Sequence, residues 1–154
     1  MDELIRRFDD LEPGPGYEPY CRPSRDSICR IEAHFGMSLP AGLIQFARQA
    51  KHFNGWFASL GRDYTNPRHI IRINSYWRRR RKTRAIPRQL VAFTVGFDED
   101  LDCFDLSSFQ ADSGKYEVRY WTPGVVDASP YVGFAEYVEA MVGDWEQARQ
   151  SRRR

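Results

Sequence analysis

The sequence has no long apolar run and few cysteines, and both shortages limit what the protein can be. No stretch approaches the roughly 18 apolar residues typical of a membrane-spanning helix, so we expect no membrane partner. Cys21, Cys29 and Cys103 form no C-x-x-C pair, and this odd number of thiols favours a reducing compartment. The opening MDELIRRFDDLEP is too charged for a secretory signal. These features together predict a cytoplasmic protein.

The common catalytic and metal-binding motifs are also absent from the sequence. There is no G-x-S-x-G, no P-loop and no Rossmann glycine pattern. His34, His52 and His69 are too widely spaced to form an H-E-x-x-H or similar ligand pair. Cys103 lies between apolar residues and is better explained as a small buried hydrophobe than as a nucleophile. We therefore expect no enzyme, no metal and no cofactor.

Aromatic residues and clustered charges are what the sequence does contain. Its 154 residues include ten Phe, eight Tyr and four Trp, enough for one domain with its own core. Apolar residues at spacings of three and four predict helices. Ser24 is suited to cap the second helix, Gly36 to end it, and Pro40 to begin the third. The predicted helices cover residues 4–11, 24–35, 40–50, 75–86 and 133–150.

Runs of β-branched, aromatic and alternating residues predict the strands. They are HIIRIN (69–74), LVAFTVGF (90–97), CFDLS (103–107) and KYEVRYWT (115–122). Separate runs of helix and strand indicate a single α+β domain, with an antiparallel or mixed sheet and helices packed mainly on one face. We divide the chain into an N-terminal helix and linker (1–23), the α+β domain (24–146) and a basic C-terminal tail (147–154).

The stretch TVGFDEDLDCFDLS (94–107) concentrates five carboxylates between two apolar segments. A calcium loop beginning at Asp98 would need Gly at its sixth position and Glu at its twelfth, where Cys103 and Phe109 stand. Acid–base catalysis needs two carboxyl groups in different environments, and water in a turn would make them alike. The pattern therefore predicts a charged hairpin tip, which contacts either a partner or only water.

The segment YWRRRRKTR (76–84) has two interpretations of equal weight. Four consecutive arginines on a helix point in all directions, so one reading is a solvated helix whose side chains lie over the adjacent surface. The other is an electrostatic patch for phosphate or an acidic protein. Tyr76 and Trp77 suit either stacking on a ligand or anchoring to the core. The net charge of the whole chain is only +2, so any basic binding is local.

Several segments, taken in order, resemble the SUKH superfamily of small α+β proteins (Smi/Knr-like). They are the helix pair around Leu39 and Pro40, the Asn54-Gly55 turn, the acidic hairpin ending in FDLSS, the strand YEVRYW and the closing helix GFAEYVEAMV. The resemblance covers about Asp26 to Val142. Two departures are the lack of glycine within DEDLD and the added arginine-rich segment.

The resemblance implies an immunity protein that binds and neutralises a cognate bacterial toxin, such as a nuclease or a contact-dependent effector. The alternative from the residues themselves is a nucleic-acid-binding or regulatory adaptor that uses the arginines. Charged residues would steer the partner, and aromatic residues would anchor it. The candidate contact residues are Trp56, Phe57, Trp77, Arg78, Arg79, Arg80, Arg81, Asp98, Glu99, Asp100 and Asp102.

Overall fold

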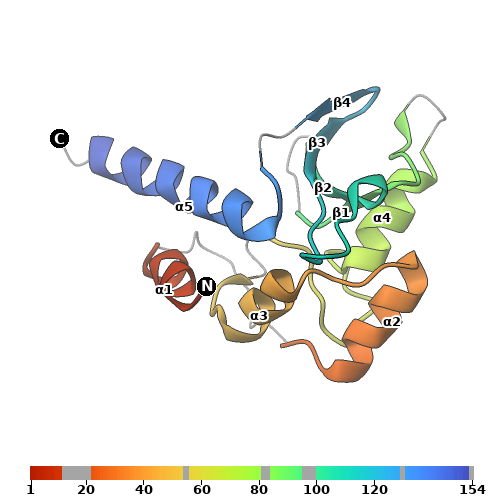
Figure 1. The fold of residues 1–154 in the computed structure, drawn as a ribbon, viewed down its shortest axis with the longest axis horizontal. Coiled ribbons are helices and arrows are strands. Elements are labelled where there is room, and N and C mark those ends of the chain that lie inside the picture. Colours follow the sequence, from red (N-terminus) through yellow and green to blue (C-terminus); the bar gives the residue numbers. More distant parts are fainter. Residues whose placement is uncertain (12–21, 54–55, 81–83, 95–99, 129–130, 153–154) are drawn as a thin grey trace.

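A computed structural model of the chain confirms the α+β class. It describes residues 1–11, 22–53, 56–80, 84–94, 100–128 and 131–152. Within these residues there are five α-helices and one four-stranded antiparallel sheet (Figure 1). The helices are α1 (Asp2–Asp10), α2 (Arg25–Phe35), α3 (Ala41–Gln49), α4 (Ile70–Arg78) and α5 (Phe134–Ser151), and the strands are β1 (Leu90–Ala92), β2 (Leu101–Asp105), β3 (Val118–Thr122) and β4 (Val125–Ala128).

The sheet is a meander in the order β1-β2-β3-β4, and each neighbouring pair is antiparallel. Pro123 and Gly124 join β3 to β4, and Gly124 has a φ of 92°. Proline followed by a positive-φ glycine suits the two central positions of a tight turn. The predicted strands at 90–97, 103–107 and 115–122 overlap with β1, β2 and β3 but differ in their bounds. β1 ends at Ala92, with residues 95–97 outside the described part of the chain; residues 106–107 form a 3-10 turn after β2; and β3 begins only at Val118. β4 was not predicted.

Helices contact the sheet from both faces. Phe104 of β2 packs on Phe134 of α5, with ring centroids 6.4 Å apart. Trp121 of β3 packs on Trp77 of α4 at 5.3 Å. Phe104 pairs with Val118, three residues before Trp121, so the two rings point to opposite faces. The sequence predicted helices mainly on one face of the sheet. The structure shows that α4 also packs on the opposite face.

The prediction that HIIRIN (69–74) is a strand was wrong, because this segment begins α4. The His69 side chain caps the helix by accepting a hydrogen bond from the Ile71 backbone. Ile70, Ile73 and Asn74 are buried at helical spacing. Burial of this face outweighs the strand preference of the isoleucines. The helix predicted for residues 75–86 ends at Arg78, so Arg79 and Arg80 follow the helix rather than forming part of it.

The remaining helices follow their sequence signals. Ser24 caps α2 through a 3.2 Å bond from the Ser27 backbone, and Gly36 ends it in the left-handed conformation with a φ of 65°. α3 begins after Pro40, as predicted. α5 continues through Ser151, so residues 147–151 of the predicted tail are helical. Within the part of the chain that the structure describes, no helix has the length and apolar character that crossing a membrane requires.

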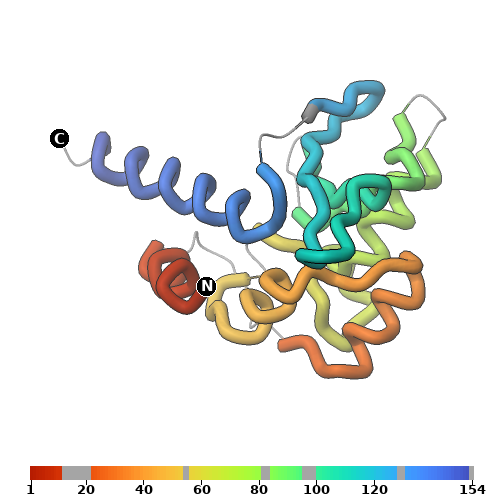
Figure 2. Tube along the Cα trace, in the orientation of Figure 1, coloured from red at the N-terminus to blue at the C-terminus, as the bar shows by residue number. Residues whose placement is uncertain are grey.

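An aromatic core joins the N-terminal helix to the rest of the molecule. Phe8 of α1 is buried with its ring 4.9 Å from Phe46 of α3 and 6.1 Å from Trp145 of α5. Arg7 forms ion pairs with Glu139 and Glu146 of α5, the latter at 2.8 Å. Figure 2 shows α1 lying beside α5, which extends away from the sheet. α1 is therefore packed into the same body as the α+β domain.

Candidate partner interface

The structure places only part of the predicted acidic tip. Asp98 and Glu99 lie outside the described residues, whereas Asp100 directly precedes β2 and Asp102 is the second residue of that strand. The Asp102 carboxylate is on the face of the sheet that meets α5, because it accepts a hydrogen bond from Tyr137 of that helix. Asp102 is therefore part of a packed surface rather than of an open turn.

Asp102 is half-buried and bonded by neutral groups. Its Oδ2 accepts a 2.7 Å hydrogen bond from the Tyr137 hydroxyl of α5 and a longer one, 3.5 Å, from the Thr94 hydroxyl. Among the described residues, no lysine or arginine forms an ion pair with it. Burial raises the pKa of the Asp102 carboxyl, and the two hydrogen bonds only partly oppose that effect. The negative charge at this position is therefore poorly compensated within the described chain.

Tyr120 stands at the centre of a group of carboxylates beside Asp102. It pairs directly with Asp102 of β2 on one side and with Asp127 of β4 on the other. A hydrogen bond to Asp100 raises the pKa of the Tyr120 hydroxyl to about 12. The Tyr120 side chain is 37 % exposed. We call Asp100, Asp102, Tyr120 and Asp127 the acidic face.

A pocket of about 240 Å³ adjoins the acidic face and extends along α5. Asp102 forms one end, and Asp144 and Trp145 of α5 line it further along the helix. The rings of Tyr131 and Tyr137 meet edge to face, with centroids 5.8 Å apart. We call this the aspartate pocket; its lining residues are Asp102, Tyr131, Tyr137, Met141, Asp144 and Trp145.

The three aromatic residues proposed as anchors occupy different environments. Phe57 has no exposed surface and stacks on Phe53 at 5.0 Å, so it belongs to the core. Trp77 is partly buried against Trp121. Trp56 is 38 % exposed, and its ring lies 4.0 Å from that of Trp145 at the end of the aspartate pocket. Trp56 is thus the most accessible of the three and adjoins a residue that lines the pocket.

The described arginines of the basic segment are partly engaged by their own chain. Arg78 donates to the Leu90 carbonyl at 3.3 Å and lies over the Phe35 ring at 5.4 Å. Arg80 lies over Tyr76 at 4.5 Å and also hydrogen-bonds its hydroxyl. Arg79 is exposed, and Arg81 lies outside the described residues. The predicted basic patch therefore does not present all its arginines to a ligand.

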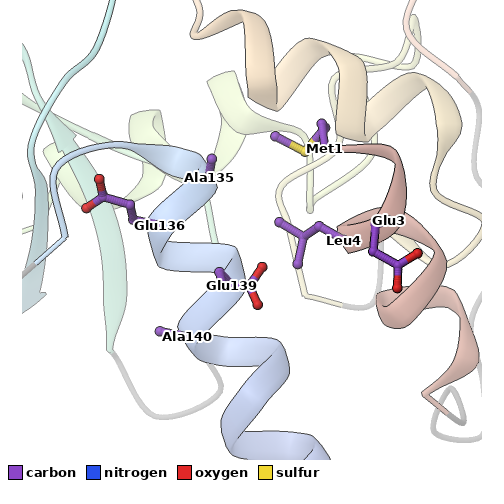
Figure 3. Close-up of a pocket in the computed structure, with 7 residues that line it drawn as sticks. All are labelled: Met1, Glu3, Leu4, Ala135, Glu136, Glu139 and Ala140. Atoms are coloured by element: carbon purple, nitrogen blue, oxygen red, sulfur yellow. The ribbon is translucent and has the colours of Figure 1, made fainter.

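A second hollow lies between α1 and α5 and has a volume of about 520 Å³. Figure 3 shows Met1 and Leu4 on its α1 side, facing Ala135 and Glu139 of α5. Its carboxylates already have partners: Glu3 pairs with Arg6, Glu139 pairs with Arg7, and Glu136 accepts a bond from the Val132 backbone. Glu3 and Glu139 are thus paired with cations, and Glu136 is an exposed carboxylate, in contrast to the half-buried Asp102.

Within the described residues, no group of three or more His, Cys, Asp or Glu side chains is placed to hold a metal ion. Cys103 is fully buried in β2, as predicted, and burial raises the pKa of its thiol well above the ordinary value. A thiol in this environment is a packing residue.

Of this surface, the sequence named only Asp100 and Asp102 as candidate contact residues. Asp127 lies on the unpredicted β4, and Asp144 was treated only as part of an amphipathic helix. The alternation in KYEVRYWT was a usable signal, because it places Tyr120 on the side opposite Trp121. The meeting of Tyr137 with Asp102 depends on how the N-terminal part of α5 packs on the sheet, which no local pattern encodes.

Comparisons with known proteins give a fold likeness. No model of a known protein family matches the chain, and no curated protein matches it. The fold is similar to that in a crystal structure of a protein from Pseudomonas syringae pv. tomato, with a TM-score of 0.58. The similarity covers 90% of this chain and 92% of that one at 14% sequence identity. At this identity the likeness concerns the fold alone.

Proposed function

We propose that the protein is an immunity protein that binds a cognate toxin through the acidic face and the adjoining aspartate pocket, and so neutralises it in the cytoplasm. The observation that carries the proposal is the half-buried Asp102 carboxylate, which the described chain bonds only with neutral hydroxyl groups. Burying a charge without a countercharge costs stability. Such a cost is expected where a group serves binding rather than folding.

The chemistry of the acidic face suits a basic protein partner. Asp100, Asp102 and Asp127 surround the exposed Tyr120, and tyrosine is enriched among residues that dominate binding energy. Negative charges accelerate the encounter with a positive surface, while the aromatic ring supplies buried contact area. A toxin that acts on nucleic acid has such a surface, because its substrate is a polyanion.

The order of sequence segments that resembles the SUKH superfamily gives independent support for the toxin-binding role. Many inhibitors of nucleases carry a strong net negative charge, whereas this chain has a net charge of +2. The net charge of +2 does not prevent attraction of a basic toxin, because electrostatic steering depends on the local field at the acidic face rather than on the net charge of the whole chain.

Binding to the protein encoded by the neighbouring gene tests the proposal. At micromolar concentration the two purified proteins should form a complex that abolishes the toxin's activity. The Asp100→Asn/Asp127→Asn variant should associate more slowly, and the difference should shrink as salt is added. Asp112→Asn removes the same kind of charge from an exposed turn outside the acidic face and serves as the matched control. Absence of a complex at micromolar concentration would remove the main support for this function.

A further inference from the structure

We propose that the aspartate pocket receives a single arginine side chain of the partner, whose guanidinium pairs with Asp102 and lies against the aromatic lining. This inference rests on the proposed function for the identity of the partner, but the chemistry of the pocket is testable by itself. Its basis is the combination of a partly open pocket, a half-buried carboxylate without a cationic partner among the described residues, and aromatic walls.

The size of the pocket favours one side chain over a whole metabolite. Its volume of about 240 Å³ lies below the roughly 300–1,000 Å³ of typical small-molecule sites. Asp102 at one end and Asp144 at the surface of α5 give the cavity negative charge over its length. A long cationic side chain fits such a cavity, with its apolar stem against Met141 and its charged end at Asp102.

The Asp102 carboxylate has an oxygen available for the guanidinium. Both side-chain hydrogen bonds, from Tyr137 and Thr94, reach Oδ2. Within the described residues, no hydrogen bond reaches Oδ1. A cation at Oδ1 would stabilise the ionised carboxylate and reverse the increase in pKa that burial imposes on Asp102. The bound arginine would thus relieve a cost that the free protein bears.

The aromatic lining selects arginine over lysine. Tyr131, Tyr137 and Trp145 all contribute to the pocket wall. A planar guanidinium stacks on aromatic rings and sheds its water more easily than an ammonium group. It also presents several N–H groups at once in a fixed fork, whereas an ammonium group is a compact point charge.

The other two candidate surfaces are less suited to a cation. The carboxylates of the α1–α5 hollow are already bonded within the chain. The outer edge of β4 exposes Val125 and Val126 but does not indicate what would cover them. The aspartate pocket combines, among the described residues, a defined cavity with a half-buried carboxylate that no cation of the chain pairs with.

A titration with N-acetyl-L-arginine amide, followed by ¹H–¹⁵N NMR, tests the pocket without the toxin. We expect saturable shifts at the amides of Asp102, Tyr137 and Asp144 and at the Trp145 indole, with a dissociation constant on the order of millimolar for so small a ligand. N-acetyl-L-citrulline amide is the matched control, because it has almost the same shape without the charge. Equal shifts with the citrulline compound would overturn the proposal.

Two substitutions locate the interaction. Asp144→Asn changes an exposed position of α5 and should weaken binding of the arginine compound by about threefold, whereas Asp102→Asn should weaken it by about tenfold or more. Asp112→Asn should leave it unchanged. If both pocket variants bind the arginine compound as tightly as the parent protein, the pocket is not the site.

The toxin complex then separates the failure of this inference from that of the proposed function. Loss of affinity for the toxin in Asp102→Asn and Asp144→Asn supports the pocket as the place where the toxin's arginine binds. A toxin complex whose affinity neither variant changes overturns the pocket assignment and leaves the immunity function standing. Saturable arginine binding without any toxin complex leaves the pocket chemistry standing and overturns the function, and with it the identity of the partner.

Discussion

The Tyr137 hydroxyl of α5 donates a 2.7 Å hydrogen bond to the Asp102 carboxylate of β2, across 35 residues of sequence. The Tyr137 ring also packs edge to face on Phe93, with centroids 5.2 Å apart. The pair thus fixes the helix to the sheet at one end of the aspartate pocket. It holds the carboxylate in place without neutralising it, because a hydroxyl group carries no charge.

Replacing Asp102 with asparagine should change how stability depends on pH. Burial raises the pKa of Asp102 above its unfolded value of about 3.9, so the native state retains a proton that the unfolded state has released. The free energy of unfolding of the parent protein therefore carries a contribution that falls as pH rises from about 4 through the raised pKa. Asp102→Asn lacks this contribution. Urea unfolding at a series of pH values should show that, as the pH rises from about 3 to 7, the free energy of unfolding of the variant increases relative to that of the parent.

The Tyr137→Phe variant is the companion measurement. It keeps the ring contact with Phe93 and removes the hydrogen bond, so it should cost about 1–3 kcal/mol at neutral pH, where Asp102 is ionised. In the Asp102→Asn background the same change should cost less, because the acceptor is no longer charged. A pH-independent difference between Asp102→Asn and the parent would contradict the account of a buried, poorly compensated charge.

The Asn74 side chain of α4 bonds the backbone of β1 on the edge that does not pair with β2, where a neighbouring strand would otherwise bond it. Its side chain accepts from the Ala92 backbone at 2.9 Å and donates to the Ala92 carbonyl at 2.9 Å. Asn74 is fully buried, so Asn74→Ala would leave both backbone groups unpaired and should reduce the free energy of unfolding by about 3 kcal/mol or more. Urea unfolding measures this, with Ser75→Ala on the same helix as the control. A loss below about 1 kcal/mol would show that water replaces the amide.

Local signals in the sequence were sufficient for most of the helices. Ser24 and Gly36 mark the two ends of α2, and the spacing of apolar residues defines α5. The local signals were insufficient for α4. Its isoleucines are β-branched and favour a strand, whereas the spacing of its buried residues favours a helix. Only the packing of Ile70, Ile73 and Asn74 decides between the two, and that packing involves β1, which is distant in sequence.

β4 and the aspartate pocket could not be predicted for a related reason. Val125 and Val126 are 50 % and 48 % exposed, so the strand carries no inside–outside alternation and is defined by pairing with β3. The pocket unites Asp102 of β2 with Asp144 and Trp145 of α5. Each residue type is ordinary in its own segment, and the site exists only because the N-terminal part of α5 packs against the sheet.

His69 should make the fold sensitive to mild acid. Its Nδ1 accepts from the Ile71 backbone, and Nε2 lies 3.2 Å from the Gly61 carbonyl, so the ring is neutral in the folded state. Burial lowers the pKa of His69; Asp63 opposes this effect and His34 adds to it. The unfolded state therefore binds a proton first as pH falls below about 6.5, and the free energy of unfolding should fall through that range.

The His69→Asn variant isolates this contribution. Asparagine is a good helix cap and does not titrate, so the variant should start less stable at neutral pH but lose less stability between about pH 7 and 5. Thermal unfolding at several pH values measures both properties. An equal loss in parent and variant would assign the acid sensitivity to other groups.

The arginine segment should divide into a structural and a surface part. Arg78 bonds the Leu90 carbonyl and covers Phe35, so Arg78→Ala should reduce the free energy of unfolding by about 1–2 kcal/mol. Arg79 is exposed, so Arg79→Ala should stay within about 0.5 kcal/mol of the parent. Urea unfolding of the two variants provides the comparison. Equal effects would show that the contacts of Arg78 contribute nothing beyond those of a solvated arginine.

The same variants test the nucleic-acid alternative. A regulator that used this segment would bind DNA or RNA with an affinity that falls steeply with salt, and Arg79→Ala would weaken binding without unfolding the protein. Because Arg78 and Arg80 are engaged by Leu90 and Tyr76, we expect no binding of a labelled duplex or single strand at moderate ionic strength. Salt-dependent binding that Arg79→Ala weakens, in a protein that forms no toxin complex, would instead favour the nucleic-acid function.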